Sequence, residues 1–171
     1  KLFSELAPLK IRWFSQCTIS IAQDEELLKL MADSGCVGLL IGFESLRQET
    51  LLEMDKRVNL PFVTNINALV KRIHEYGIGI YGTFIFGYSE TLEDFRRTTE
   101  AAMNMKLFMA AFNPLIPFPG TELYSRFLKT GQLTDPQWYL DPNFRFGDVP
   151  FQPAYMSAKE LHNACMEARK T

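Results

Sequence analysis

Residues 37–45 read VGLLIGFES, a short and almost continuously apolar run that ends in a glutamate and a serine. A run of this kind is typical of a strand that is covered on both faces, as the strands of parallel sheets are. Residues 12–21, 78–87 and 108–116 also read as strands, and helical patterns lie between them. The alternation predicts an α/β fold of about four parallel strands, with outer helices on one side of a curled sheet.

The composition of the 171 residues limits the kinds of function. The formal net charge is −2, from 18 Lys and Arg against 20 Asp and Glu, which excludes a basic nucleic-acid footprint and a polycationic attraction to membranes. Three cysteines are too few for a disulfide scaffold, so a reducing cytoplasm is the expected compartment. The sequence holds no run of about eighteen apolar residues, so no membrane-spanning helix is expected. The chain begins with Lys1 rather than Met, which suggests a piece of a larger protein.

Chemistry is expected where the strands end, because ligands of parallel α/β sheets sit at the carboxyl ends of the strands. Glu44 stands at the end of one strand, where a carboxylate can accept two hydrogen bonds at once from a vicinal diol such as a ribose. Glu44 could equally cap the helix that follows or pair with a lysine. Lys56 lies a dozen residues later and could hold a ligand carboxylate, although a loop lysine is usually just solvated.

Two more strands carry candidate contacts for a ligand. On the third strand Thr83, Ile85 and Gly87 share one face, and would offer a hydroxyl, a flat apolar contact and bare backbone to a planar group. An ordinary buried strand explains the same pattern. One face of the first strand is polar, which indicates a ligand, water or a hydrogen-bond network there, or else an edge strand that faces solvent. Its polar residues are Gln16, Thr18 and Ser20.

The composition of the sequence changes after residue 130. Residues 132–153 combine four prolines with five aromatic residues, which argues for a segment packed on the rest of the protein rather than a free linker. Ser157 and Glu160 are spaced as a capping box and predict a last helix. We therefore divide the chain into residues 1–130, which carry the strands, and residues 131–171, an irregular aromatic and proline-rich segment followed by a helix.

Several blocks of sequence, in this order, resemble the later part of the radical S-adenosylmethionine core, in the branch that carries a cobalamin-binding domain. The blocks are WFSQ at 13–16, a helix end and strand at 30–45, KRVN at 56–59, and residues 82–90 and 113–124. The resemblance covers about three quarters of the chain. It implies a partial, TIM-like (β/α)6 barrel that binds a [4Fe–4S] cluster and S-adenosylmethionine at its strand ends.

The resemblance also implies a role for the candidate residues. Glu44 matches the residue that holds the ribose, and Lys56 falls where a basic residue often reaches the methionine carboxylate. Ile85 is placed against the adenine by a Gly-x-Ile-x-Gly-x-x-Glu motif. Thr83 stands where this motif has its first glycine, and its side chain narrows the space left for the ligand. The polar position near the ligand on the family's third strand falls to Ser20 or Thr18.

One departure from the family bears on what this chain can do alone. The family's cluster is held by a Cys-x-x-x-Cys-x-x-Cys loop, and no such spacing occurs here. The resemblance therefore implies a fragment that holds strands three to six of the barrel. Its parent would generate a 5′-deoxyadenosyl radical, in this branch often for cobalamin-dependent methyl transfer. The isolated fragment is expected to be inactive and to hold none of these cofactors.

Other interpretations stay open. The chain could be a non-catalytic half-barrel that binds a nucleotide-like ligand or a partner chain. A complete small barrel is disfavoured, because too few strands exist to close eight. In the fragment interpretation the first strand has a bare edge. The expected partners are then the missing N-terminal half of the parent barrel or, through that edge, another copy of the chain; neither nucleic acid nor a membrane is expected.

Overall fold

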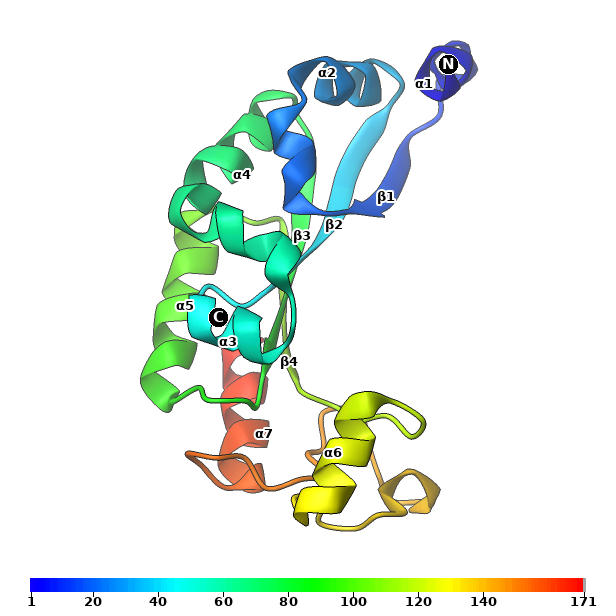
Figure 1. The fold of residues 1–171 in the computed structure, drawn as a ribbon. Helices are drawn as coiled ribbons and strands as arrows, with labels where there is room; N and C mark the ends of the chain where they lie inside the picture. The colour runs from blue at the N-terminus through cyan, green and yellow to red at the C-terminus, as the bar shows by residue number, and fades with distance from the viewer. Residues whose placement is uncertain (171) are drawn as a thin grey trace. The chain divides into compact units, whose positions relative to one another are not determined.

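The computed structural model describes residues 1–170, which form an α/β fold around a four-stranded sheet of order β1-β2-β3-β4 (Figure 1). β1 pairs in parallel with β2, and β2 in parallel with β3. Helices lie between the strands in sequence, so the predicted α/β class is confirmed. The strands are β1 (Trp13–Cys17), β2 (Cys36–Glu44), β3 (Gly79–Phe86) and β4 (Met109–Pro114). The helices are α1 (Leu2–Leu6), α2 (Glu25–Asp33), α3 (Gln48–Glu53), α4 (Ile66–Glu75), α5 (Leu92–Asn104), α6 (Glu122–Thr130) and α7 (Ala158–Ala168).

The described chain divides into two compact units. The first comprises residues 1–84 and 100–111, and the second comprises residues 85–99 and 112–170. In the first unit β2 alternates as a strand should, with Leu39, Ile41 and Phe43 buried on one face. Helices supply the other side of this core, because the apolar stripes of α2 and α4 are buried as well. Their buried residues are Leu28, Met31, Leu69, Val70 and Ile73.

β1 is shorter than the sequence predicts, which moves Ser20 off the strand. The strand ends at Cys17, and Ile19–Gln23 forms a 3-10 helix. The reason is packing: Ile19 and Ala22 are three residues apart, share one face of the 3-10 turn and are both buried. Arg72 Nη1 of α4 also donates a hydrogen bond of 3.1 Å to the Ala22 carbonyl. The predicted strand over residues 12–21 is therefore wrong beyond Cys17.

The C-terminal segment builds the core of the second unit. Phe151 is fully buried, and its ring centroid lies 5.1 Å from that of Phe127 on α6. Gly87 has a φ of +132°, and a Cβ on it would lie 2.7 Å from the Phe151 ring. The predicted capping box of Ser157 and Glu160 starts α7. The expectation that residues 132–153 pack rather than hang free is confirmed by the burial of Phe151.

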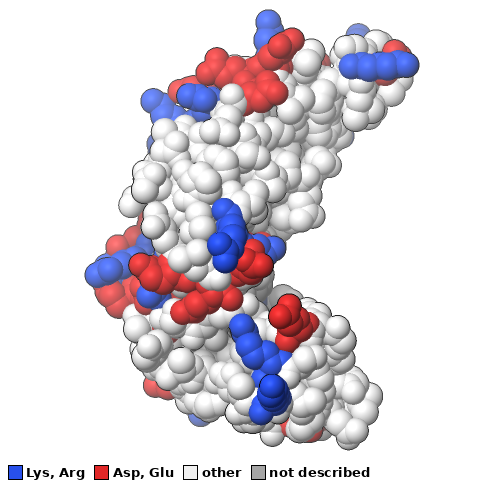
Figure 2. All heavy atoms as spheres, viewed as in Figure 1, with Lys and Arg blue, Asp and Glu red and all other residues white. Residues whose placement is uncertain are grey.

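The surface carries charges of both signs. On the face drawn in Figure 2, basic and acidic side chains are intermixed and separated by wide stretches without charge. Exposed ion pairs such as Arg97–Glu93, with nitrogen and oxygen 2.9 Å apart, contribute to this mixture. Within residues 1–170, no helix combines the length and the apolar character needed to cross a membrane.

Candidate functional site

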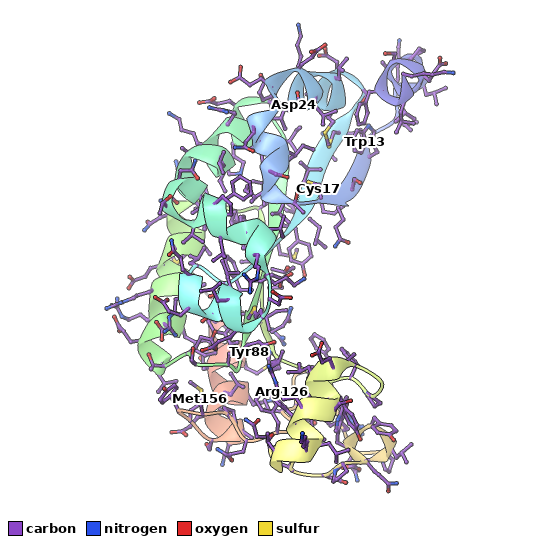
Figure 3. All side chains as sticks on the ribbon, in the orientation of Figure 1. Trp13, Cys17, Asp24, Tyr88, Arg126 and Met156 are labelled. Atoms are coloured by element: carbon purple, nitrogen blue, oxygen red, sulfur yellow. The ribbon has the colours of Figure 1, made fainter. Side chains whose placement is uncertain are left out.

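A hollow of about 270 Å³ opens in the first unit, where β1 and β2 end. Cys17, the last residue of β1, is labelled in Figure 3 and marks its position. The carboxyl ends of parallel strands are where α/β sheets bind ligands, so the hollow lies where the sequence predicts chemistry. Four of the predicted site residues are among those that line it. The lining is Gln16, Cys17, Thr18, Gly42, Glu44, Lys56, Val58 and Asn59.

Glu44 sits in a strained turn at the end of β2. Its φ is +63°, in the left-handed region that residues other than glycine seldom adopt. The Ser45 amide donates to the Phe43 carbonyl at 2.8 Å, so Glu44 is the central residue of a three-residue γ-turn, which is rare when φ is positive. A Cβ on Gly42 would lie 2.7 Å from Glu44 Oε1, so the carboxylate folds back over bare backbone. Backbone strain of this kind clusters at ligand sites.

Lys56 brings a positive charge to the Glu44 carboxylate. Its Nζ lies 3.7 Å from Glu44 Oε1, and its amide donates to the Leu51 carbonyl of α3 at 2.8 Å. The side chain of Lys56 is 50% exposed and that of Glu44 is 16% exposed, so the pair adds at most about 1 kcal/mol to stability. This ion pair agrees with the alternative that Glu44 pairs with a lysine. Because the pair stabilises the fold so little, and because both groups line the hollow, they are also candidates to bind a diol and a carboxylate of one ligand.

Asn59 is a candidate that sequence reasoning did not single out. It is 7% exposed, and its Nδ2 donates to the Gly42 and Phe43 carbonyls, both at 3.0 Å. The register between β2 and β3 shifts by one residue between Gly42 and Glu44, so these carbonyls lie where the regular ladder is broken. The one signal in the sequence is that Asn59 ends the KRVN block.

The predicted polar row reaches the hollow only in part. Gln16 and Thr18 line it, whereas Ser20 reaches it through Thr18, whose Oγ1 lies 2.5 Å from Ser20 Oγ. Thr83 borders the same place from β3, because a Cβ on Gly42 would lie 3.8 Å from Thr83 Oγ1. Three hydroxyl groups thus lie at or near the hollow.

Two predicted site residues belong to the second compact unit. Ile85 is half-buried on β3, and Gly87 follows the strand. The space beside the Gly87 Cα is filled by Phe151, Leu115 and Leu161. Within this unit, the missing side chain of Gly87 thus serves close packing against Phe151.

The cysteines do not suit an iron–sulfur cluster. Burial raises the pKa of the Cys17 thiol to about 11, with Cys36 nearby as a smaller cause, and burial also raises the pKa of Cys36. In the second unit, burial raises the pKa of Cys165 to about 12. Cluster ligands are thiolates, usually four of them. No group of three or more His, Cys, Asp or Glu among residues 1–170 is placed to hold a metal ion.

We expect alkylation of Cys17 to be slow at neutral pH and to keep accelerating up to about pH 11. Only the thiolate reacts, so at pH 8 the rate should be on the order of a hundredfold below that of an ordinary cysteine. Iodoacetamide trapping across this pH range, with mass spectrometry of the Cys17 peptide, measures the rate. The same peptide in urea-unfolded protein is the control. A rate that levels off near pH 9 in the folded protein would contradict the expectation.

Comparisons with known proteins give partial matches. No family model matches the chain. Bacteriochlorophyllide d C-12(1)-methyltransferase of Chlorobaculum tepidum is 34% identical over 125 residues, which are 72% of this chain and 27% of that protein. Cytidylyl-2-hydroxyethylphosphonate methyltransferase of Streptomyces wedmorensis is 29% identical, over 80% of this chain and 27% of that protein. The chain thus matches about a quarter of the length of these curated relatives.

A solved structure matches over a similar share of the chain. It is the radical S-adenosylmethionine methyltransferase TsrM from Kitasatospora setae with cobalamin and a [4Fe–4S] cluster bound. The match has a TM-score of 0.56 and 26% sequence identity, and covers 68% of this chain and 25% of TsrM.

Proposed function

We propose a function that is based on a family relationship. Over part of its length, this chain is related to the cobalamin-binding branch of the radical S-adenosylmethionine enzymes. The relationship over a partial region is as the sequence blocks predict. We infer that residues 1–130 correspond to strands three to six of a (β/α)6 barrel, and that residues 131–171 form an appended segment.

The hollow at the ends of β1 and β2 is, in this proposal, the place of the adenosyl ligand. Glu44 accepts hydrogen bonds from the two ribose hydroxyls, and Lys56 holds the carboxylate of the methionine part. Gln16, Thr18 and Thr83 supply polar contacts around them, with Ser20 holding Thr18. A volume of about 270 Å³ is below the usual range for a whole drug-sized ligand, so this hollow takes part of the molecule.

One observation carries the proposal. Glu44 ends β2 and Lys56 lies twelve positions later, between α3 and the 3-10 helix Arg57–Asn65, yet their charged atoms lie 3.7 Å apart in one hollow. Glu44 also adopts a backbone conformation that costs stability, which is hard to explain if it only caps a helix.

The chemistry of the parent is a further part of the proposal. The parent would cleave S-adenosylmethionine to a 5′-deoxyadenosyl radical, and in this branch would transfer methyl groups with cobalamin. The thiols described above do not fit a [4Fe–4S] cluster, so we assign the cluster to other polypeptide and expect the isolated chain to be inactive. The three cysteines are free, which suits a reducing cytoplasm.

The partner we propose is the rest of the barrel. β1 is the first strand in the sheet order and pairs with β2 alone among the described strands, so its other edge is open to a further strand. The upstream half of the parent barrel would occupy this edge, and self-association through it is the substitute in the isolated chain.

The test is a calorimetric titration with two probes, S-adenosylhomocysteine and 5′-methylthioadenosine, which lacks the amino-acid part. Although the isolated chain is not expected to retain S-adenosylmethionine, we expect it to bind both added probes saturably, with S-adenosylhomocysteine the tighter by about tenfold because Lys56 meets its carboxylate. Lys56→Met should bring the two affinities together. Lys71→Met, at an exposed position on α4, is the matched control and should keep the difference.

Two results would count against the proposal. If neither probe binds, the chain is better described as a non-catalytic half-barrel that meets a partner chain. If both bind and Lys56→Met leaves their ratio unchanged, the hollow is not where the methionine part lies.

A further inference from the structure

We propose that Asn59 is a positioning residue for Glu44: its side-chain amide fixes the γ-turn that aims the Glu44 carboxylate at the ribose hydroxyls. The inference rests on the proposed adenosyl site and deepens it. It names the residue through which the site prefers a ribose to a 2′-deoxyribose.

The contacts of Asn59 leave its amide a single orientation. Both N–H groups of Nδ2 are used, one on the Gly42 carbonyl and one on the Phe43 carbonyl, each at 3.0 Å. Among the described residues its side chain makes no other hydrogen bond, and Asn59 is buried. The amide therefore ties the 3-10 helix Arg57–Asn65 to the end of β2 at one point.

This point is where the strained turn needs support. The Phe43 carbonyl accepts from Asn59 Nδ2 and also from the Ser45 amide at 2.8 Å, so both of its lone pairs are satisfied while Glu44 stays at a φ of +63°. A glutamate at this φ costs conformational free energy, so the turn persists only because the surrounding contacts hold it in place. Without the amide of Asn59, the turn is free to relax toward extended backbone.

Relaxation of the turn would move the carboxylate. Glu44 Oε1 now lies 2.7 Å from the place of a Cβ on Gly42, folded against the strand end. A carboxylate reads two neighbouring hydroxyls only if both of its oxygens are aligned with them, and a shift of about 0.5 Å is enough to spoil such a site. Asn59 thus acts on selectivity through Glu44 and need not touch the ligand.

The experiment compares S-adenosylhomocysteine with its 2′-deoxyribose analogue in four proteins. We expect the unmodified chain to prefer the ribose form by about tenfold or more, because one charge-assisted hydrogen bond is at stake. Asn59→Asp keeps the shape but removes both donors, and should reduce the preference to below about threefold. Asn59→Ser is too short for its hydroxyl to reach either carbonyl and adds no charge, so it should reduce the preference as Asn59→Asp does. Asn67→Asp, at an exposed position on α4, should keep the full preference.

Every outcome of this experiment either supports or contradicts the positioning role of Asn59. A residue that only stabilises the fold would lower both affinities by the same factor and leave their ratio, so an unchanged ratio in a folded Asn59→Asp overturns the inference. Failure of both Asn59→Asp and Asn59→Ser to fold also overturns it, since Asn59 would then determine the fold. A chain that binds neither probe fails the proposed function itself, whereas loss of the Asn59 effect alone leaves that function standing.

Discussion

Replacing Glu44 by glycine is expected to abolish adenosyl-ligand binding while leaving the fold as stable as before or more stable. Glycine adopts a φ of +63° without the penalty of about 1–2 kcal/mol that other residues meet there. The ion pair with Lys56 is half exposed, so losing it costs about 1 kcal/mol or less. The free energy of unfolding should therefore rise by up to about 1 kcal/mol. Two hydrogen bonds to a charged group disappear, so affinity should fall by about a hundredfold or more.

Urea unfolding and calorimetric titration measure the two effects on the same preparations. Asp55→Gly is the matched control, because Asp55 is another acidic residue with positive φ, at +53°, and does not line the hollow. It should gain stability and keep its affinity. Glu44→Gln keeps the strained turn and loses the charge, so it should lose affinity without gaining stability. Tight binding by Glu44→Gly would remove Glu44 from the site.

Replacing Phe151 by alanine is expected to destabilise the second unit by about 3–5 kcal/mol. The ring is fully buried, packs on Phe127 and fills the space beside the Gly87 Cα, so its removal leaves a cavity that rigid neighbours cannot close. Urea unfolding followed by near-ultraviolet circular dichroism should show the loss, and hydrogen exchange should place it in residues 85–99 and 112–170.

Phe146→Ala is the matched control for this experiment. Phe146 lies in the same segment but is 80% exposed, and Arg169 Cζ lies 5.1 Å from its ring centroid. A cation–π contact at an exposed position is worth about 0.5–1 kcal/mol, so the control should change stability little. Equal effects of the two variants would mean that Phe151 has no special place in the core.

The parts of the fold that could be predicted are those set by local patterns. β2 was recognisable because an unbroken apolar run of its length suits a buried strand, although only the face of Leu39, Ile41 and Phe43 is fully buried and Leu40 on the other face stays partly exposed. α7 was recognisable because Ser157 and Glu160 satisfy each other's orphan groups. The expectation that ligands bind at the carboxyl ends of the strands then pointed to Glu44 and Lys56, and both residues line one hollow in the structure.

The parts that could not be predicted depend on backbone or on tertiary packing. Alternation continues through residues 18–21, so only the burial of Ile19 and Ala22 against helices reveals that β1 has already ended. Asn59 binds carbonyl groups, which every residue has, so no pairing of side chains points to it. A positive φ at Glu44 runs against local preference, which favours glycine or asparagine there.

The one-residue offset between β2 and β3 makes the length of β2 matter as much as its composition. Deleting Phe43 would remove the register shift between β2 and β3. Gly42 already pairs with Thr83, and the residue after it would then pair with Phe84 without a bulge. Glu44 would then occupy the position that Phe43 has now, and its side chain would point to the buried side of the sheet, away from the hollow. An in-frame deletion of three nucleotides would thus bury the carboxylate in the core and remove it from the hollow.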